Sequence, residues 1–308
     1  MTTAYYNTDA NAVLSVIDAS QSGAWISVAG PDEAELDQLA ETYKLNRDLL
    51  ADAVDIYEAP RIEKDEGNIY IYTRYCFPEG REIATEPVLI IHTSDFIITV
   101  MRADTTIFNS FFNGRIPVMT SRRTQLTMQI LAEINNSYQR QLNKVSKQIL
   151  RIRAQLRQSS ISNRDFVGII ELEEDLNEFL AALQPQASLL VSFTITKYLR
   201  LHEDDKEIVE DLKLETSELI ELTKSRLRTL VNIRQAYDAI ATNNLNQTFK
   251  RLTSIAIFLT IPTVIGGLWG MNVSVPFAEY EHAFTIVLTI IFTLITLTVT
   301  FFRRKKWF

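Results

Sequence analysis

Apolar and polar residues follow one another differently in three parts of the chain. Residues 1–118 contain short runs in which apolar positions alternate or cluster, which is typical of β-strands. Asp32 follows Gly30-Pro31 and is a suitable N-cap for a helix that ends near Tyr43. We expect strands over residues 25–28, 69–75, 88–91 and 96–100, a short helix over 49–54, and turns at 66–68 and 78–80. Residues 1–118 are therefore predicted to form a mixed α/β domain.

After Pro117 the apolar residues recur at intervals of three and four residues, which is the spacing of amphipathic helices. Gly168 and Pro185 are the only glycine and proline between residues 118 and 261. Three long helices are predicted, near residues 120–157, 163–200 and 206–270. The third would span on the order of 90 Å. Because propensity alone does not stabilise such a helix, residues 119–251 should form a packed helical stalk region.

Two stretches near the C-terminus, residues 252–269 and 283–302, contain no charged residue. At about 1.5 Å per residue, each makes a helix of about 27–30 Å, close to the ~30 Å of bilayer hydrocarbon. Residues 270–282 between them are too few for a domain, so a membrane hairpin is predicted. The alternative is a buried hairpin in a soluble core, but such helices seldom reach this length without a charge.

Basic residues flank both stretches. Lys250 and Arg251 precede the first, and a tail over residues 303–308 with four basic residues follows the second, whereas the loop over 270–282 has neither Lys nor Arg. The positive-inside rule places both termini in the cytoplasm and the loop outside a cell (inner or plasma) membrane. Three aromatic residues are expected at the membrane interfaces, namely Trp269, Tyr280 and Trp307.

Composition excludes several functions. The net charge of −7 argues against a general nucleic-acid surface. Cys76 is the single cysteine, which rules out an internal disulfide, and the three histidines lie far apart and are assigned structural roles. The chain lacks nucleotide-binding and hydrolase motifs, and its acidic clusters are typical of solvated helix faces. We therefore expect neither an enzyme nor a nucleotide-binding protein.

One face of the first apolar stretch has the character of a pore lining. Two helices cannot enclose a water-filled path, so a conducting protein would need several copies in a ring. Small and hydroxyl-bearing residues let helices approach and can replace water around an ion, while bulky apolar residues can close a path by dewetting. Ordinary helix packing explains the same pattern equally well. The face comprises Asn246, Phe249, Leu252, Ala256, Thr260, Thr263 and Gly267.

Asn272 favours the pore over simple packing. It follows Gly270, a residue expected to be flexible, at the outer end of the first apolar stretch. A ring of amide oxygens suits a hard cation that keeps its water, such as Mg²⁺. Glu279 and Glu281 in the loop would raise the local concentration of cations.

At this point the chain resembles the CorA family of divalent-cation transporters. The signature is Gly270-Met271-Asn272 at the end of the first of two C-terminal spans, followed by the basic tail over 303–307. Residues 25–28, 48–52 and 60–63 are also similar to the family. The resemblance implies an α+β membrane protein that assembles as a funnel-shaped homopentamer. A cytoplasmic α/β domain would lead into a long stalk helix that becomes the pore helix, with a second transmembrane helix around it.

The resemblance also implies roles along the pore. Gly270, Met271 and Asn272 would form the external selectivity filter. Asn246 would lie at the cytoplasmic pore mouth, and Leu252 at a hydrophobic gate. Thr263 occupies the position of a threonine that lines the pore in this family.

The same resemblance implies a regulatory Mg²⁺ site. Asp52 and Asp211 fall where acidic residues of adjacent subunits hold this ion. Loss of cytoplasmic Mg²⁺ would then leave carboxylates that repel and favour conduction. Ala51 stands where the family often has an acidic residue, which leaves a second regulatory ion without a ligand there.

Other positions depart from the family pattern. Trp269 replaces the usual Tyr, and Phe249 and Thr260 stand where methionines are expected. These changes leave the transport hypothesis intact and bear on the details of gating and on ion preference.

The leading hypothesis is a Mg²⁺ channel or transporter driven inward by the membrane potential, with Mg²⁺ as both cargo and regulator. Zn²⁺, Co²⁺ or Ni²⁺ transport by the same fold is the alternative within this class, and Zn²⁺ prefers N and S ligands that the pore face lacks. The alternative of another class is a membrane-anchored coiled-coil sensor or structural protein.

Overall fold

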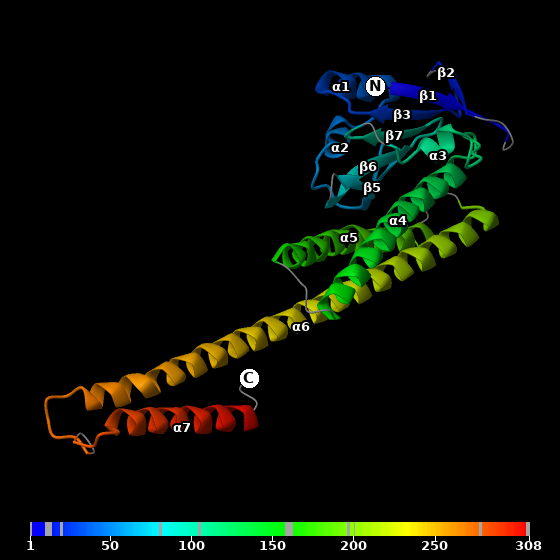
Figure 1. The fold of residues 1–308 in the computed structure, drawn as a ribbon. Helices are drawn as coiled ribbons and strands as arrows, with labels where there is room; N and C mark the ends of the chain where they lie inside the picture. The colour runs from blue at the N-terminus through cyan, green and yellow to red at the C-terminus, as the bar shows by residue number, and fades with distance from the viewer. Residues whose placement is uncertain are drawn as a thin grey trace. The chain divides into compact units, whose positions relative to one another are not determined.

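The structure is a computed structural model. It describes residues 2–9, 14–18, 21–79, 82–103, 106–157, 163–195, 198–199, 201–276 and 279–305. Contacts divide the chain into two compact units, Met1–Ile233 and Arg234–Phe308. Each unit is described by itself, although one helix contributes to both (Figure 1).

The described part of the first unit contains one seven-stranded sheet with the order β2-β1-β3-β7-β6-β5-β4. β3 and β7 pair in parallel and the other neighbours are antiparallel. The strands are β1 Thr2–Tyr6, β2 Ser15–Ile17, β3 Trp25–Ala29, β4 Arg61–Asp65, β5 Asn68–Glu79, β6 Glu82–His92 and β7 Ile97–Met101. The predicted strands are all present, whereas β1, β2 and β4 carried no clear period of two.

Helices cover both faces of this sheet. The helices are α1 Glu33–Tyr43, α2 Arg47–Asp52, α3 Asn109–Phe112, α4 Arg123–Arg157, α5 Asn163–Ile195, α6 Glu203–Trp269 and α7 Ala283–Arg304. α1 and α2 share one apolar core with one face of the sheet, and α3, α4, α5 and the first part of α6 share a larger core with the other. The sheet therefore separates two cores, so a strand residue contacts one helix group or the other.

Capping residues determine where the first two helices begin. Asp32 accepts a hydrogen bond from the Glu35 backbone N–H at 2.8 Å, and the Glu35 carboxylate accepts one from the Asp32 N–H at 3.3 Å, so the predicted N-cap of α1 is confirmed as a capping box. The expected helix over 49–54 is shifted. Asn46 caps α2 by accepting from the Asp48 and Leu49 N–H groups, so the helix begins at Arg47 and ends at Asp52.

One predicted turn is confirmed and one is wrong. Glu66 and Gly67 have φ values of 45° and 89° and form the turn between β4 and β5. Pro78 and Glu79 instead continue β5, where Pro78 pairs with Ile83 of β6. β4 pairs with β5 only as far as Tyr72, so Pro78 has no paired β4 residue on that side, and an edge of this kind tolerates proline. Gly80 lies outside the described residues.

The long helices are confirmed to within a few residues. α6 is one helix of 67 residues with Pro262 inside it. In the first unit its apolar face is buried against α4 and α5, which supplies the packing that such a length requires. The structure thus has the predicted α/β domain, long helix and two apolar C-terminal helices.

Trp25 on β3 is the largest side chain buried under the helices of the larger core. It is 0% exposed, and its indole Nε1 donates to the Thr99 hydroxyl at 3.0 Å. Phe108 and Phe111 meet its ring edge to face at 5.4 and 5.8 Å between centroids. This residue therefore ties the sheet to the segment that leads into α4.

Candidate functional site

The second unit is a hairpin of two apolar helices, the end of α6 and all of α7. Both are long and apolar enough to cross a membrane, and only 6% of each apolar window is buried. The core helix of a soluble protein would be mostly buried. The exposure therefore argues against the soluble-core alternative and leaves these surfaces for lipid or further protein.

One face of α6 packs against α7 within this unit. Ser254 is buried, and the rings of Phe258 and Phe302 lie 5.8 Å apart. Ile261 and Ile265 continue the half-buried face at helical spacing. This contact occupies a single stripe of α6, because residues three and four apart share a face.

The candidate pore residues lie on the part of α6 that α7 leaves free. Phe249 and Leu252 are each 58% exposed. All seven are exposed in the single chain, namely Asn246, Phe249, Leu252, Ala256, Thr260, Thr263 and Gly267. The structure therefore brings them together on one uncovered strip.

Two threonines give this strip its acceptor character. The Thr260 hydroxyl donates to the Ala256 carbonyl at 2.8 Å, and the Thr263 hydroxyl donates to the Leu259 carbonyl at 2.7 Å. A hydroxyl has one proton and two lone pairs, so each proton is used inside the helix while the oxygen can still accept. Such a surface presents oxygen, the ligand atom that hydrated Mg²⁺ prefers.

The Gly270-Met271-Asn272 segment begins where α6 ends. The Gly270 N–H donates to the Gly266 carbonyl at 2.9 Å, and the chain then bends through exposed Met271 and Asn272. The φ of Gly270 lies outside the left-handed region, so the backbone conformation does not require glycine at this position. A Cβ added there would lie 3.3 Å from the Gly266 oxygen, a tight contact at the helix end. The Asn272 amide is thus free to face solvent or a neighbouring copy.

The loop and tail carry the remaining predicted residues. Glu279 and Glu281 are exposed, as is His282. The interface residue Trp307 and the tail residue Lys306 lie outside the described residues. Trp269 and Tyr280 are half-buried and exposed, respectively, at the ends of the hairpin.

The two carboxylates assigned to regulation lie in the first unit on separate elements. Asp52 ends α2, and Asp211 lies on an exposed position of α6. Within one chain the structure does not bring them together. Among the described residues no group of three His, Cys, Asp or Glu side chains is placed to hold a metal ion. A metal site with both aspartates would therefore need a second copy.

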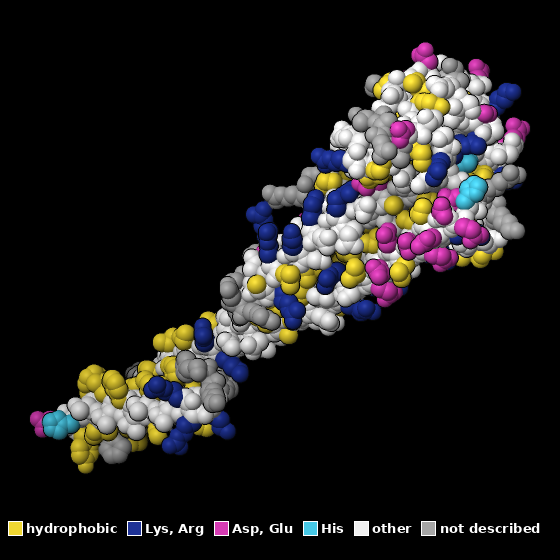
Figure 2. Space-filling view, turned by 90° about the vertical axis from the view of Figure 1, so that its right-hand side faces the viewer, with side chains coloured by type: hydrophobic (Ala, Val, Ile, Leu, Met, Phe, Trp, Pro, Cys, Tyr) yellow, Lys and Arg dark blue, Asp and Glu magenta, His cyan; other side chains and the backbone are white. Residues whose placement is uncertain are grey.

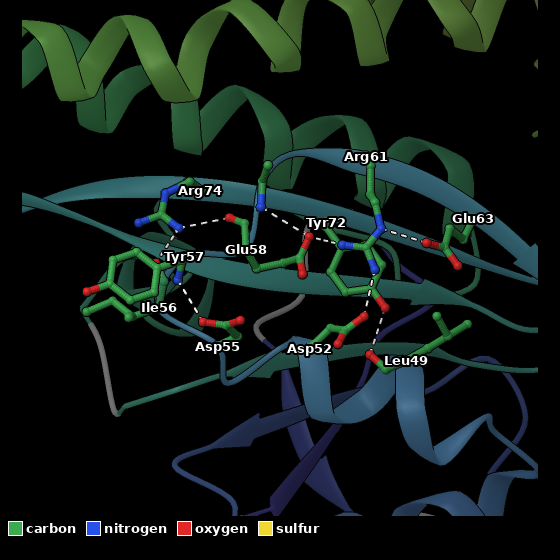
Figure 3. Close-up of polar contacts among 11 residues, drawn as sticks. Leu49, Asp52, Asp55, Ile56, Tyr57, Glu58, Arg61, Glu63, Tyr72 and Arg74 are labelled. Carbon is green, nitrogen blue, oxygen red and sulfur yellow. Dashed lines mark hydrogen bonds and ion pairs between the residues drawn. The ribbon is translucent and has the colours of Figure 1, made fainter.

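Asp52 already has a partner that the sequence-based prediction missed. The Arg61 guanidinium contacts the Asp52 carboxylate at 2.7 Å and the Glu63 carboxylate at 2.6 Å, and it also pairs with Glu58 (Figure 3). Its carbon lies 4.0 Å from the centre of the Tyr72 ring. The available signal was Arg61 in the residue 60–63 stretch, which lies in a segment rich in carboxylates.

Two β5 residues hold α2 and the segment that connects it to β4. The Tyr72 hydroxyl donates to the Leu49 carbonyl at 2.7 Å, and burial raises the pKa of Tyr72 well above its usual range, so the proton remains. The Arg74 guanidinium donates to the Ile56 and Glu58 carbonyls at 2.7 and 2.9 Å (Figure 3). β5 therefore anchors the neighbourhood of Asp52 through its side chains.

Comparison with known proteins agrees with this architecture. A family model described as "CorA-like Mg2+ transporter protein" matches residues 20–304. The chain belongs to the CorA family. The family resemblance drawn from Gly270-Met271-Asn272 is therefore confirmed, and the family's description is that of a transporter.

Similar CorA proteins match nearly the whole chain. Identity is 27% over 295 residues to the cobalt/magnesium transport protein CorA of Methanocaldococcus jannaschii, covering 92% of this chain and 90% of that protein. Identity is 21% over 321 residues to the cobalt/magnesium transport protein CorA of Thermotoga maritima, covering 98% and 88%.

A solved structure confirms the fold. The complete CorA magnesium transporter from Methanocaldococcus jannaschii matches with a TM-score of 0.88 at 23% identity, covering 100% of this chain and 99% of that chain. The α/β part, the long helix and the apolar hairpin therefore occur together in a known fold.

Proposed function

We propose that this CorA-family chain forms a homopentameric Mg²⁺ channel in a cell membrane, with both termini in the cytoplasm. The observation that carries the proposal is the exposed strip of α6 opposite its contact with α7. Several copies arranged in a ring would place this strip around a common axis. The two helices of one chain cannot enclose a water-filled path by themselves.

The strip supports selection of a hydrated dication. A ring of Asn272 amides next to Gly270 and Met271 would accept hydrogen bonds from the water around Mg²⁺, which dehydrates reluctantly. Glu279 and Glu281 would concentrate cations outside. Deeper in the pore, Thr263 and Thr260 would offer hydroxyl oxygens to the same water shell.

The cytoplasmic end of the strip supports a gate. Phe249 and Leu252 are bulky, apolar and exposed on one face. Copies of these side chains around an axis would exclude water and close the path. Asn246 would receive the ion at the inner mouth. Entry needs no nucleotide, because a divalent ion gains about 4.6 kcal/mol per 100 mV of potential at ~2.3 per charge.

Regulation would occur between copies. Asp52 of one copy and Asp211 of the next would share a cytoplasmic Mg²⁺ that keeps the ring closed. Arg61 would compete with Mg²⁺ for Asp52, because its guanidinium already contacts the Asp52 carboxylate at 2.7 Å. Mg²⁺ would have to displace or share that contact, which favours release when cytoplasmic Mg²⁺ falls.

Asn272→Ala tests the selectivity filter. Purified wild-type protein in liposomes should take up Mg²⁺ under an inside-negative potential, and the variant should lose most of this uptake. Asn143→Ala is the matched control, because Asn143 is an exposed asparagine on α4. Wild-type uptake by the Asn272→Ala protein would contradict the filter assignment, and uptake of Co²⁺ and Zn²⁺ in the same assay ranks the cargo.

Asp52→Ala and Asp211→Ala test regulation. Each variant should need a higher Mg²⁺ concentration to protect the cytoplasmic region from protease and to stop uptake. Glu41→Ala, at an exposed position of α1, is the control for loss of a surface charge. Unchanged Mg²⁺ protection in both aspartate variants would remove these residues from the sensor.

A further inference from the structure

A chain of buried side-chain hydrogen bonds connects the sheet to α6. The Thr73 hydroxyl on β5 donates to Gln186 Oε1 on α5 at 3.0 Å. Gln186 Nε2 donates to Asn135 Oδ1 on α4 at 2.8 Å, and Asn135 Nδ2 donates to the Thr216 hydroxyl on α6 at 3.0 Å. None of the four side chains is more than 2% exposed. The four elements thus meet through one polar path inside an apolar core, which we name the buried polar chain.

This arrangement is sensitive to the position of α6. Buried amides and hydroxyls cost free energy unless they are hydrogen-bonded, and their bonds are strong where the dielectric constant is low. A slip of α6 by one residue would move Thr216 by about 1.5 Å along the axis and turn it by about 100°. Either change takes its oxygen out of the 2.7–3.2 Å range in which such bonds form. Apolar side chains of similar volume would pack without this requirement.

The neighbours of Thr73 contact the opposite side of the sheet. Tyr72 and Arg74 flank it in β5. Tyr72 donates to the Leu49 carbonyl of α2, the helix that ends at Asp52, and Arg74 donates to the Glu58 carbonyl in the segment that follows. Successive strand residues point to opposite faces, so three consecutive positions join the α2 region to the buried polar chain. At the other end, Thr216 lies five residues after Asp211 on the same helix. The path therefore runs from the strand that holds α2 to the helix that carries Asp211.

We propose that Thr73, Gln186, Asn135 and Thr216 are positioning residues that set the axial and rotational register of α6 on the sheet. α6 is continuous to Trp269, so its register in the first unit is a property of the helix that carries the pore residues. For the response to Mg²⁺ the inference rests on the proposed function. The positioning itself is independent of transport.

The main test replaces the whole buried polar chain by apolar groups of similar size. The variant combines Thr73→Val, Gln186→Leu, Asn135→Leu and Thr216→Val, which leaves no buried amide without a partner. It should remain folded, while the Mg²⁺ concentration that half-inhibits uptake changes by about 2- to 30-fold. Thr223→Val is the control. Thr223 is also 0% exposed and donates to the carbonyl four residues earlier, as Thr216 does, but it is not part of the buried polar chain. A wild-type Mg²⁺ response in the folded fourfold variant would overturn the proposal.

A conservative pair keeps the test valid if the fourfold variant does not fold. Thr216→Ser retains the hydroxyl and should keep the wild-type response, whereas Thr216→Val should shift it. Equal responses of these two variants would overturn the role of the hydroxyl.

A distance measurement separates this inference from the proposed function. Spin labels at Asn143→Cys and Glu218→Cys would report the distance between α4 and α6. Both positions are exposed, and the native Cys76 is buried. When labelled chains are diluted into an excess of unlabelled chains, so that distances between copies do not contribute, protein with an intact buried polar chain should give one narrow distance, and the fourfold variant a shifted or broadened one. Identical distributions would overturn the positioning role. Failure of wild-type protein to take up Mg²⁺ would count against the proposed function alone, because the distances need no transport.

Discussion

Two threonines of the same helix each donate to the carbonyl four residues earlier, but only one of them also bonds to another helix. Thr216, in the first unit, is 0% exposed and accepts a hydrogen bond from Asn135 of another helix. Thr260, in the second unit, is exposed and donates only within its own turn of α6, to Ala256. The first contact requires a specific neighbour, whereas the second would form in an isolated helix.

The same contrast holds for whole regions. The first unit buries two apolar cores and joins its elements by side-chain bonds, including the contacts of Arg61 and Arg74 shown in Figure 3. The second unit exposes most of its apolar surface. A single chain thus buries the cores of the first unit but leaves most of the surface of the apolar hairpin exposed. In the space-filling view, acidic side chains gather on one side of the first unit (Figure 2).

The largest effect should follow from opening the larger core of the first unit. Trp25→Ala removes a fully buried ring and its bond to Thr99, and we expect a loss of about 3–5 kcal/mol. Thermal unfolding of the detergent-purified full chain measures it. Tyr57→Ala is the control, because Tyr57 is an aromatic side chain that is 89% exposed. A similar unfolding midpoint for both variants would contradict the assignment of Trp25 to the core.

A buried histidine of the first unit should make the stability of the protein sensitive to acid. His92 at the end of β6 has a buried Nε2, and burial together with Arg123 lowers its pKa to about 4. The unfolded state then binds more protons between pH 6.5 and 4, so the free energy of unfolding falls as pH falls through that window. The loss should be on the order of 2–3 kcal/mol.

His92→Gln should remove this part of the acid sensitivity, which is measured as the pH dependence of the unfolding midpoint. His282→Gln, at an exposed position of the second unit, is the control for the loss of a histidine side chain. An unchanged profile for the His92 variant would show that this side chain is not kept neutral by the fold.

The smallest contrast tests the hydroxyls directly. Thr216→Val leaves the Asn135 amide without one partner and should cost about 1–3 kcal/mol of folding free energy. Thr289→Val, whose hydroxyl donates within α7 to Thr285, should change stability by less than about 0.5 kcal/mol. Thermal midpoints of the two variants, compared in one detergent, check the difference. Equal losses would mean that the second unit also depends on specific polar contacts.

Much of the fold could be predicted from local patterns. The capping box at Asp32, the long helices and the two charge-free stretches depend on neighbours in sequence, so they were recognisable. β4 could not be predicted, because its polar sequence is held by pairing with β5 rather than by its own alternation. Pro78 was misassigned for a related reason, since only the sheet order shows that this part of β5 has a free edge.

The candidate sites divide in the same way. The strip from Asn246 to Gly267 follows from helical spacing, which the sequence contains. Arg61 as the partner of Asp52, and the path from Thr73 to Thr216, join residues that lie 9 and 143 positions apart. No local pattern predicts such contacts, because they depend on how strands and helices pack.

The sequence by itself determined the membrane hairpin, the segment after α6 with Asn272, and the family to which the chain belongs, since hydropathy, helical period and a short motif are local properties. Tertiary structure alone decided which face of α6 contacts α7, which carboxylate is already neutralised by an arginine, and where a buried polar chain reaches the long helix. Those outcomes depend on the low-dielectric interior, where a polar group is stable only if folding brings its partner to it.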